Sequence, residues 1–300
     1  MIPFEAAQYN GVDKQTNKQT NKHMEAIVIK VIVMGAMGRM GRAIVQQSLA
    51  SEDIEIAGCV ERKEHALLGT DIGNGIILKS SIESVVQDSE QTQASKIPSS
   101  LSLPVIIDFT SPEATINHLE TACLLGCPMV IGTTGLNKSQ NEKLAKAAES
   151  IPIVYAANMS LGMNLLFKLA ALAAKALGNE YEVEILEAHH HKKVDAPSGS
   201  ALKIAGVIAE ALERDLDKVA VYGRQGSHGP RKPEEIGIFA IRGGDIIGEH
   251  TAMFIGDGER LEITHRVQNR NTFASGALRA ARFAANASPG LYNMMDVLGI

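Results

Sequence analysis

A glycine-rich turn between an apolar run and a helical pattern is the feature that most constrains the fold. Gly35, Gly38 and Gly41 directly follow the apolar run at residues 26–34 and open the helical spacing at residues 39–50. Glycines let the backbone approach an anion closely, and the free N–H groups at the start of a helix stabilise its charge. The GxxGxxG spacing is a variant of the usual GxGxxG, so the string alone also fits a purely structural turn. Its position between a strand and a helix favours dinucleotide binding.

The rest of the first half repeats this alternation of strand and helix. Ser111, Pro112 and Glu113 supply an N-cap, a first-turn proline and an acid that complements the helix dipole. Alternating strands and helices predict an α/β domain of Rossmann-like type, with a parallel sheet and crossover helices. The expected strands are residues 26–34, 54–60, 105–109, 128–131 and 153–155, and the expected helices are residues 39–50, 112–125 and 139–150.

The pattern changes after Asn158, where strands begin to follow one another with short connections. This favours an antiparallel or mixed sheet and hence a second α/β domain. Gly243, Gly244 and Asp245 stand between two of these strands and predict a hairpin turn. The expected strands are residues 182–188, 237–242, 246–254 and 260–267, and the expected helices are residues 163–177, 201–212 and 272–285.

Composition narrows the class of function. The net charge is -5 and no dense Lys/Arg stripe occurs, which argues against a nucleic-acid partner and favours small-molecule chemistry. Lys30 interrupts the longest early apolar stretch, which falls short of the ~20 residues that cross a membrane. Cys59, Cys123 and Cys127 form no CxxC pair, so neither a disulfide framework nor a zinc site is indicated, and a reducing compartment fits.

Two segments look separate from the folded domains. Residues 1–23 carry a polar near-repeat around Lys14 and Lys18 and predict a disordered extension, and Met24 could be the true start. They lack the apolar core of a secretory signal and the arginines of a transit peptide. Residues 87–102 are rich in Ser and Gln without an apolar period and predict an exposed insertion.

Residues at the ends of the early strands are candidates for holding a dinucleotide. Glu61 ends the second strand about 20 residues after Gly41, where an acid can accept hydrogen bonds from the adenosine ribose. Arg62 could instead pair with the 2′-phosphate of NADP(H), or be a solvated surface charge, so NADH and NADPH both stay open. Residues 132–134 and 156–159 follow later strands, and together they fit a nicotinamide wall, although either alone could be an ordinary turn.

The segment at residues 187–202 concentrates groups that transfer protons. His189 ionises near neutral pH, and Lys193 is a compact cation that could donate a proton. Ser198, Gly199 and Ser200 lie at the start of the next predicted helix, where hydroxyls and free N–H groups suit a carboxylate. A metal-binding histidine tract and a solvated basic turn are the alternatives. Metal is disfavoured because adjacent histidines in a strand point to opposite faces.

Together these segments resemble the 4-hydroxy-tetrahydrodipicolinate reductase (dihydrodipicolinate reductase) family over residues 24–300. The resemblance implies a dinucleotide-binding domain at residues 24–158, to which residues 271–300 return. It also implies a substrate-binding domain at residues 159–270 that builds a homotetramer. The motifs that carry it are residues 35–41, 108–110, 112–113, 132–135, 156–160, 187–202, 241–242, 244–245, 248–250, 290–292 and 296–299, of which residues 187–202 are the specific ones.

The resemblance also implies roles for single residues. His189 matches a general acid/base, Lys193 a proton donor, and His190, Gly199 and Ser200 contacts to the substrate carboxylate. Ser200 stands where the family often has Thr, and Met159 stands where some members have Phe, which puts an aromatic contact to the nicotinamide in doubt. The cofactor positions are Gly35, Ala36, Met37, Gly38, Arg39, Met40, Glu61, Arg62, Gly132, Thr133, Thr134, Ala156, Ala157, Asn158 and Met159.

The implied activity is a cytoplasmic reduction of 4-hydroxy-2,3,4,5-tetrahydrodipicolinate, a cyclic imine dicarboxylate, with NADH or NADPH and without a metal. Its product, tetrahydrodipicolinate, belongs to the diaminopimelate route to lysine. A dehydrogenase of an amino-acid semialdehyde is one alternative, but it needs another proton relay. A non-catalytic dinucleotide sensor is the other, and it would have no use for Lys193 beside a carboxylate-binding helix end.

Overall fold

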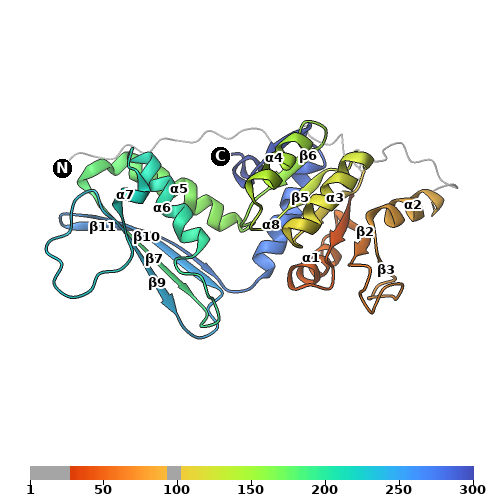
Figure 1. The fold of residues 1–300 in the computed structure, drawn as a ribbon, viewed down its shortest axis with the longest axis horizontal. Coiled ribbons are helices and arrows are strands. Elements are labelled where there is room, and N and C mark those ends of the chain that lie inside the picture. Colours follow the sequence, from red (N-terminus) through yellow and green to blue (C-terminus); the bar gives the residue numbers. More distant parts are fainter. Residues whose placement is uncertain (1–27, 93–102) are drawn as a thin grey trace, which may run out of the picture.

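The computed structural model describes residues 28–92 and 103–300, which form two sheets joined by helices. Figure 1 shows the sheets at opposite ends of an elongated molecule. The expectations for residues 1–23 lie outside the described residues. Part of the predicted insertion is helical, because α2 (Ile82–Thr92) extends into it, and its remaining residues 93–102 also lie outside the described residues.

The first sheet is parallel throughout and confirms the predicted Rossmann-like class. Its strand order is β12-β6-β5-β4-β1-β2-β3, so the chain changes direction across the sheet between β1 and β4. The short edge strands β3 and β12 were not predicted. The bounds are β1 (Ile29–Met34), β2 (Ile54–Val60), β3 (Leu78–Lys79), β4 (Val105–Asp108), β5 (Met129–Ile131), β6 (Pro152–Tyr155) and β12 (Gly290–Tyr292).

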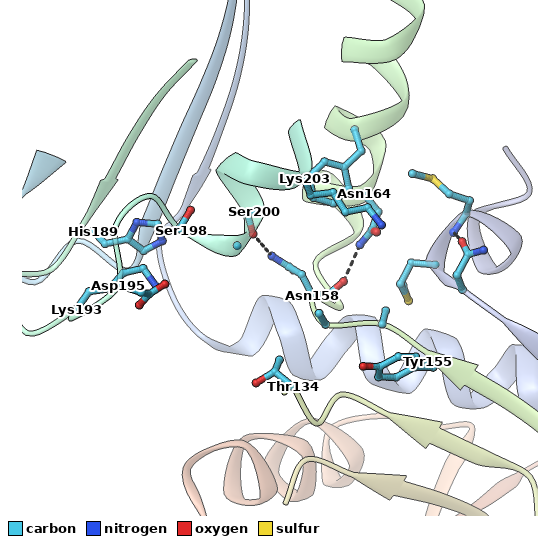
Figure 2. A pocket seen from close by; sticks show the side chains of 17 residues that line it. Thr134, Tyr155, Asn158, Asn164, His189, Lys193, Asp195, Ser198, Ser200 and Lys203 are labelled. Atoms are coloured by element: carbon cyan, nitrogen blue, oxygen red, sulfur yellow. Dashed lines mark hydrogen bonds and ion pairs between the residues drawn. The ribbon is translucent and has the colours of Figure 1, made fainter. Parts of the chain in front are cut away.

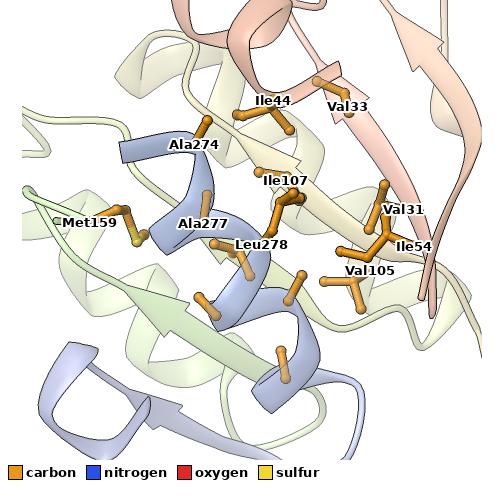
Figure 3. Close-up of a cluster of buried hydrophobic side chains, with 14 of the residues drawn as sticks. Val31, Val33, Ile44, Ile54, Val105, Ile107, Met159, Ala274, Ala277 and Leu278 are labelled. Atoms are coloured by element: carbon orange, nitrogen blue, oxygen red, sulfur yellow. The ribbon is translucent and has the colours of Figure 1, made fainter. Parts of the chain in front are cut away.

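Both faces of this sheet are buried, which explains its continuous apolar strands. Val31 and Val33 of β1 pack on the face covered by α1 (Arg39–Leu49) and α8 (Asn271–Ala284). Ile32 and Met34, one residue out of phase, pack on the opposite face. That face is covered by α2, α3 (Pro112–Leu125) and α4 (Lys138–Ala147). Figure 3 shows α8 lying against the strands, so this late helix completes the core of the first sheet.

The second sheet is mixed, as the closely spaced strands predicted. Its order is β11-β10-β7-β9-β8, with β7, β8 and β9 parallel and β10 and β11 antiparallel to their neighbours. Helices α5 (Leu161–Leu177) and α6 (Gly199–Ala211) cover one face (Figure 1). The strands are β7 (Glu182–His189), β8 (Ala220–Val221), β9 (Ile236–Arg242), β10 (Gly248–Gly256) and β11 (Glu259–Val267). Two short helical elements connect them, the 3-10 turn η1 (Gly178–Glu180) before β7 and α7 (Leu216–Val219) before β8. A further short helix, α9 (Met294–Leu298), follows β12.

The prediction of a hairpin turn at residues 243–245 is wrong. Strands β9 and β10 lie on opposite sides of β7 and do not pair with each other. The connection instead crosses the end of β7, where the Gly243 N–H donates to the His189 carbonyl at 3.0 Å and the His190 N–H donates to the Ile246 carbonyl at 2.7 Å. This crossing fixes the end of β7 on both sides.

Helix α5, with the turn that follows it, is long and apolar enough by composition to cross a membrane. Met163, Leu166 and Phe167 are buried in the cluster that α5 forms with α6 and the second sheet. We therefore interpret α5 as a core helix of the second sheet.

Candidate active site

A cavity of about 760 Å³ lies where the carboxyl ends of β5 and β6 approach the start of α6. The first sheet contributes Thr134 and residues 155–158, and the second sheet contributes the end of β7 and the loop that follows it. Figure 2 shows His189, Lys193 and Ser198 on one side of the cavity and Thr134 and Tyr155 on another. A hydrogen bond of 3.2 Å from Asn158 Nδ2 to Ser200 Oγ connects the two sides.

His189, at the end of β7, is held by a buried carboxylate. Its Nδ1 lies 2.6 Å from Oε2 of Glu187, whose side chain is fully buried. Arg242 donates two hydrogen bonds of 2.8 Å to the same carboxylate, one to each oxygen. Strand alternation places Glu187 and His189 on the same face, and Arg242 is paired with His189 in the neighbouring strand β9.

Burial and neighbouring charges shift the pKa values of Glu187, His189 and the neighbouring His250. Burial opposes ionisation of Glu187, but the hydrogen bonds from Arg242 and His189 outweigh it and lower the pKa of the carboxyl. Burial also lowers the pKa of His189, although Glu187 pulls in the opposite direction. Burial lowers the pKa of the neighbouring His250 to about 4. His189 is therefore neutral near pH 7, with one ring nitrogen occupied by Glu187.

Lys193 lies in the loop after β7 and lines the cavity. Its Nζ donates to both oxygens of Asp195 at 2.8 Å, and about a fifth of its side chain is exposed. The hydrogen bond from Lys193 lowers the pKa of Asp195, which therefore stays charged. An ammonium held in this way can donate to a ligand in the cavity while keeping its counter-ion.

The first turn of α6 presents free donors to the cavity. Ser198 is the N-cap, and its buried hydroxyl accepts from the Ala201 N–H at 3.2 Å and contacts His250 Nε2 at 2.9 Å. The Ser198 N–H donates to Glu187. In the part of the chain that the structure describes, the N–H groups of Gly199 and Ser200 have no acceptor. An anion at this helix end would meet Gly199 and Ser200, whereas Ser198 acts as the cap.

The glycine turn fits a dinucleotide phosphate. Gly35 has φ +60°, and a Cβ on Gly41 would lie 2.1 Å from the Gly35 carbonyl oxygen, so both positions require glycine. Glu61 Oε2 accepts from the Met37 N–H at 3.2 Å, which brings the carboxylate to the turn, and Arg62 is exposed. Ala36 is buried, Gly38 and Arg39 are exposed, and Met40 is half-buried at the start of α1. The turn lies at the end of β1, and β4 lies between β1 and β5, the nearer of the two strands that end at the cavity.

Not every predicted cofactor residue presents its side chain to this edge of the sheet. Gly132 packs against the Phe109 ring, where a Cβ would lie 2.0 Å from Cε1. The buried Thr133 hydroxyl lies 2.8 Å from that of Thr115, inside a network centred on Asp108. Met159 is buried in the core beneath α8. Thr134, Ala156, Ala157 and Asn158 do line the cavity.

The other predicted site residues also differ in whether they line the cavity. His190 does not line the cavity, and its buried Nδ1 has no partner in the described chain. Lys203, which sequence reasoning missed, lines the cavity one turn after Ser200 and stacks over Phe167 at 5.6 Å. Helical spacing from Ser200 would have pointed to it. Within residues 28–92 and 103–300, no cluster of His, Cys, Asp and Glu suits a metal ion.

Comparison with known proteins identifies the family. The model "Dihydrodipicolinate reductase, N-terminus" matches residues 29–159, and "Dihydrodipicolinate reductase, C-terminus" matches residues 162–298. The 4-hydroxy-tetrahydrodipicolinate reductase of Magnetococcus marinus is 47% identical over 280 residues, covering 91% of this chain and 99% of the relative. That of Nitrosomonas europaea is 46% identical over 278 residues, covering 91% and 98%.

A solved structure agrees with these matches. The dihydrodipicolinate reductase of Paenisporosarcina sp. TG-14, solved with dipicolinate bound, superposes with a TM-score of 0.71 at 25% identity. The match covers 90% of this chain and 98% of that one. The chain therefore belongs to the dihydrodipicolinate reductase family, whose curated members are named 4-hydroxy-tetrahydrodipicolinate reductase.

Proposed function

We propose that this protein reduces 4-hydroxy-2,3,4,5-tetrahydrodipicolinate to 2,3,4,5-tetrahydrodipicolinate with NADH or NADPH, in the diaminopimelate route to lysine. The activity is the one its relatives are named for. One observation carries the proposal for the site: a histidine held by a buried carboxylate, a lysine ammonium and the first N–H groups of α6 meet in one cavity at the edge of the dinucleotide-type sheet.

The cavity suits a ring with two carboxylates. One carboxylate fits the N–H groups of Gly199 and Ser200, where the positive end of the 13-residue helix α6 stabilises a negative charge. Lys193 and Lys203 add two cations around the same cavity. The dipicolinate bound by the Paenisporosarcina relative is a ligand of this kind, which supports the assignment.

The reaction needs proton transfer from the protein. The 4-hydroxyl leaves as water, and a hydride then adds to the ring carbon conjugated to the imine. The electron pair so displaced moves to the ring nitrogen, where a proton must neutralise it. When bound, the reduced nicotinamide supplies the hydride. We assign this proton to Lys193 Nζ, with His189 supporting the transfer. The enamine so formed tautomerises to the imine product when the proton on nitrogen is lost and the neighbouring ring carbon gains one, so the net change consumes one proton and releases one water.

The cofactor choice depends on Glu61 and Arg62. A hydrogen bond from the Met37 N–H holds the Glu61 carboxylate at the glycine turn. There the carboxylate can accept hydrogen bonds from the ribose hydroxyls. Arg62 is exposed beside it and could pair with a 2′-phosphate. We propose that both NADH and NADPH are used.

A direct assay tests the activity and the cofactor argument together. NADH and NADPH oxidation is followed with freshly prepared substrate, for the wild type and for Arg62→Ala. We expect turnover with both cofactors, and a fall in the NADPH efficiency of the variant that NADH does not share. Equal effects on both cofactors would remove Arg62 from the 2′-phosphate site.

We also propose a cytoplasmic homotetramer. The cysteines Cys59, Cys123 and Cys127 are free, which suits a reducing compartment. The face of the second sheet opposite α5 and α6 carries apolar side chains, including Leu186, Phe239 and Ile241, the last with 47% of its surface exposed. Burying this face between copies would remove it from water. Light scattering on the purified protein should give four times the chain mass, and a monomer would contradict this.

A further inference from the structure

Four ionisable side chains lie on one face of three adjacent strands. Glu187 and His189 alternate along β7 with the residues that face away from α6. Arg242 of β9 is paired with His189, and His250 of β10 is paired with Glu187. The sheet register therefore brings all four together under the start of α6.

The Glu187 carboxylate is shared between two parts of the site. Its Oε2 lies 2.6 Å from His189 Nδ1, and its Oε1 accepts from the Ser198 N–H at 3.0 Å. Arg242 donates to both oxygens and also to the Asp195 carbonyl at 2.7 Å. A fully buried carboxylate is costly unless its oxygens are hydrogen-bonded, and here each accepts from Arg242 and from one further group.

The other ring nitrogen of His189 is left with room around it. A Cβ on Gly248 would lie 3.1 Å from His189 Nε2, so glycine at this position keeps space beside that nitrogen. The His250 ring meets the His189 ring edge to face at 5.2 Å and limits its rotation. The imidazole therefore has a fixed orientation, and its Nε2 has no hydrogen-bond partner among residues 28–92 and 103–300.

We propose that Glu187 and Arg242 are positioning residues that fix His189 in the tautomer with a proton on Nδ1 and hold it in register with the first turn of α6. The carboxylate accepts a hydrogen bond from Nδ1–H, which leaves Nε2 as the nitrogen able to exchange a proton with a ligand. Its second oxygen accepts a hydrogen bond from the Ser198 N–H. The same carboxylate therefore positions both His189 and the first turn of α6. This inference rests on the proposed function, in which His189 acts on the substrate.

The charges around His189 predict opposite effects for the two positioning residues. Burial lowers the pKa of His189, Glu187 raises it, and Lys193 and Arg242 lower it. His250 is the neighbour from β10, and Asp195 is paired with Lys193. Removing the charge of Glu187 should therefore lower the pKa of His189. Removing the charge of Arg242 should let the Glu187–His189 pair take up a proton at higher pH.

Nitrogen NMR of the imidazole, with steady-state kinetics, tests the proposal. In the wild type we expect a protonated Nδ1 and an unprotonated Nε2 near pH 7. Glu187→Gln should move the titration of His189 to lower pH and reduce kcat roughly 100-fold, with the NADH dissociation constant unchanged. Arg242→Met should move the titration to higher pH. Glu182→Gln, the same change on an exposed residue of β7, is the matched control and should match the wild type.

The outcomes separate this inference from the proposed function. A wild-type His189 protonated on Nε2 would overturn the inference, and this measurement needs no folded variant. Shifts of the same sign in Glu187→Gln and Arg242→Met would also overturn it, as would an unchanged kcat in folded Glu187→Gln. A wild type that oxidises no NADH with the substrate would instead overturn the proposed function, and the NMR result would still decide the tautomer and the two shifts.

Discussion

Two lysines in the cavity differ in how they are held. Lys193 is bound to both oxygens of Asp195, whereas Lys203 has no carboxylate partner among the described residues and lies over the Phe167 ring. A lysine without a counter-ion is available to an incoming anion. At the scale of single residues, this separates Lys193, which we propose as the proton donor, from a lysine suited to binding an anion.

Replacement of Lys203 should therefore affect binding more than chemistry. We expect Lys203→Met to raise KM for the dicarboxylate about 3- to 10-fold with little change in kcat, because an exposed charge pair contributes modestly. Lys168→Met, on the exposed surface of α5 and outside the cavity, is the control. A fall in kcat with KM unchanged would place Lys203 in the chemical step instead.

The buried His250 should make stability depend on pH. Burial lowers its pKa from 6.5 to about 4, so the unfolded chain binds a proton at a higher pH than the folded chain does. The stabilisation is complete above pH 6.5 and is lost as pH falls toward 4, by up to about 3 kcal/mol.

Urea unfolding at several pH values measures this effect. His250→Gln should flatten the loss of unfolding free energy between pH 6.5 and about 4, although His189, whose pKa is also lowered, keeps part of the slope. If the unfolding free energy of the variant fell with pH as steeply as that of the wild type, His250 would not be the cause of the pH dependence.

At the scale of elements, α8 approaches the backbone of another segment at a glycine. A Cβ on Gly276 would lie 1.8 Å from the Met159 carbonyl oxygen, so the helix reaches the backbone only because that position has no side chain. Gly206, within α6, has open space around its Cα.

The same substitution should have opposite effects in the two helices. Gly276→Ala should reduce the free energy of unfolding by about 1–3 kcal/mol, because α8 must move away from the backbone around Met159. Gly206→Ala should increase it by up to about 1 kcal/mol, because alanine is the better helix former. Urea denaturation compares them, and a stabilised Gly276→Ala variant would contradict this account of the packing.

Elements with a strong local signal could be predicted from the sequence. Helix α3, with Ser111 as N-cap and proline in its first turn, has the bounds that were predicted. Strands β3 and β12 are only two and three residues long and form by pairing at the sheet edges, which no local pattern records. The hairpin expectation failed because turn residues indicate a reversal but not which strand pairs with which.

At the scale of the whole molecule, the motifs predicted several of the segments that line the cavity but not which way each side chain points. Residues 132–134 and 156–159 do lie at the carboxyl ends of β5 and β6, yet Thr133 and Met159 turn into the interior. Glu187 and Arg242 lie 55 positions apart, and only the pairing of β7 with β9 brings them together. Long-range pairing of this kind has no signal in a single sequence.

The most direct test of the central claim compares wild type with Lys193→Ala on the authentic substrate. NADH oxidation gives turnover, and quenching of NADH fluorescence gives cofactor affinity in the same preparation. We predict saturable, substrate-dependent oxidation by the wild type and a loss of roughly 100-fold in kcat in the variant, with NADH affinity unchanged. A folded wild type that binds NADH but oxidises none with the substrate, or a variant with equal turnover, would contradict the account.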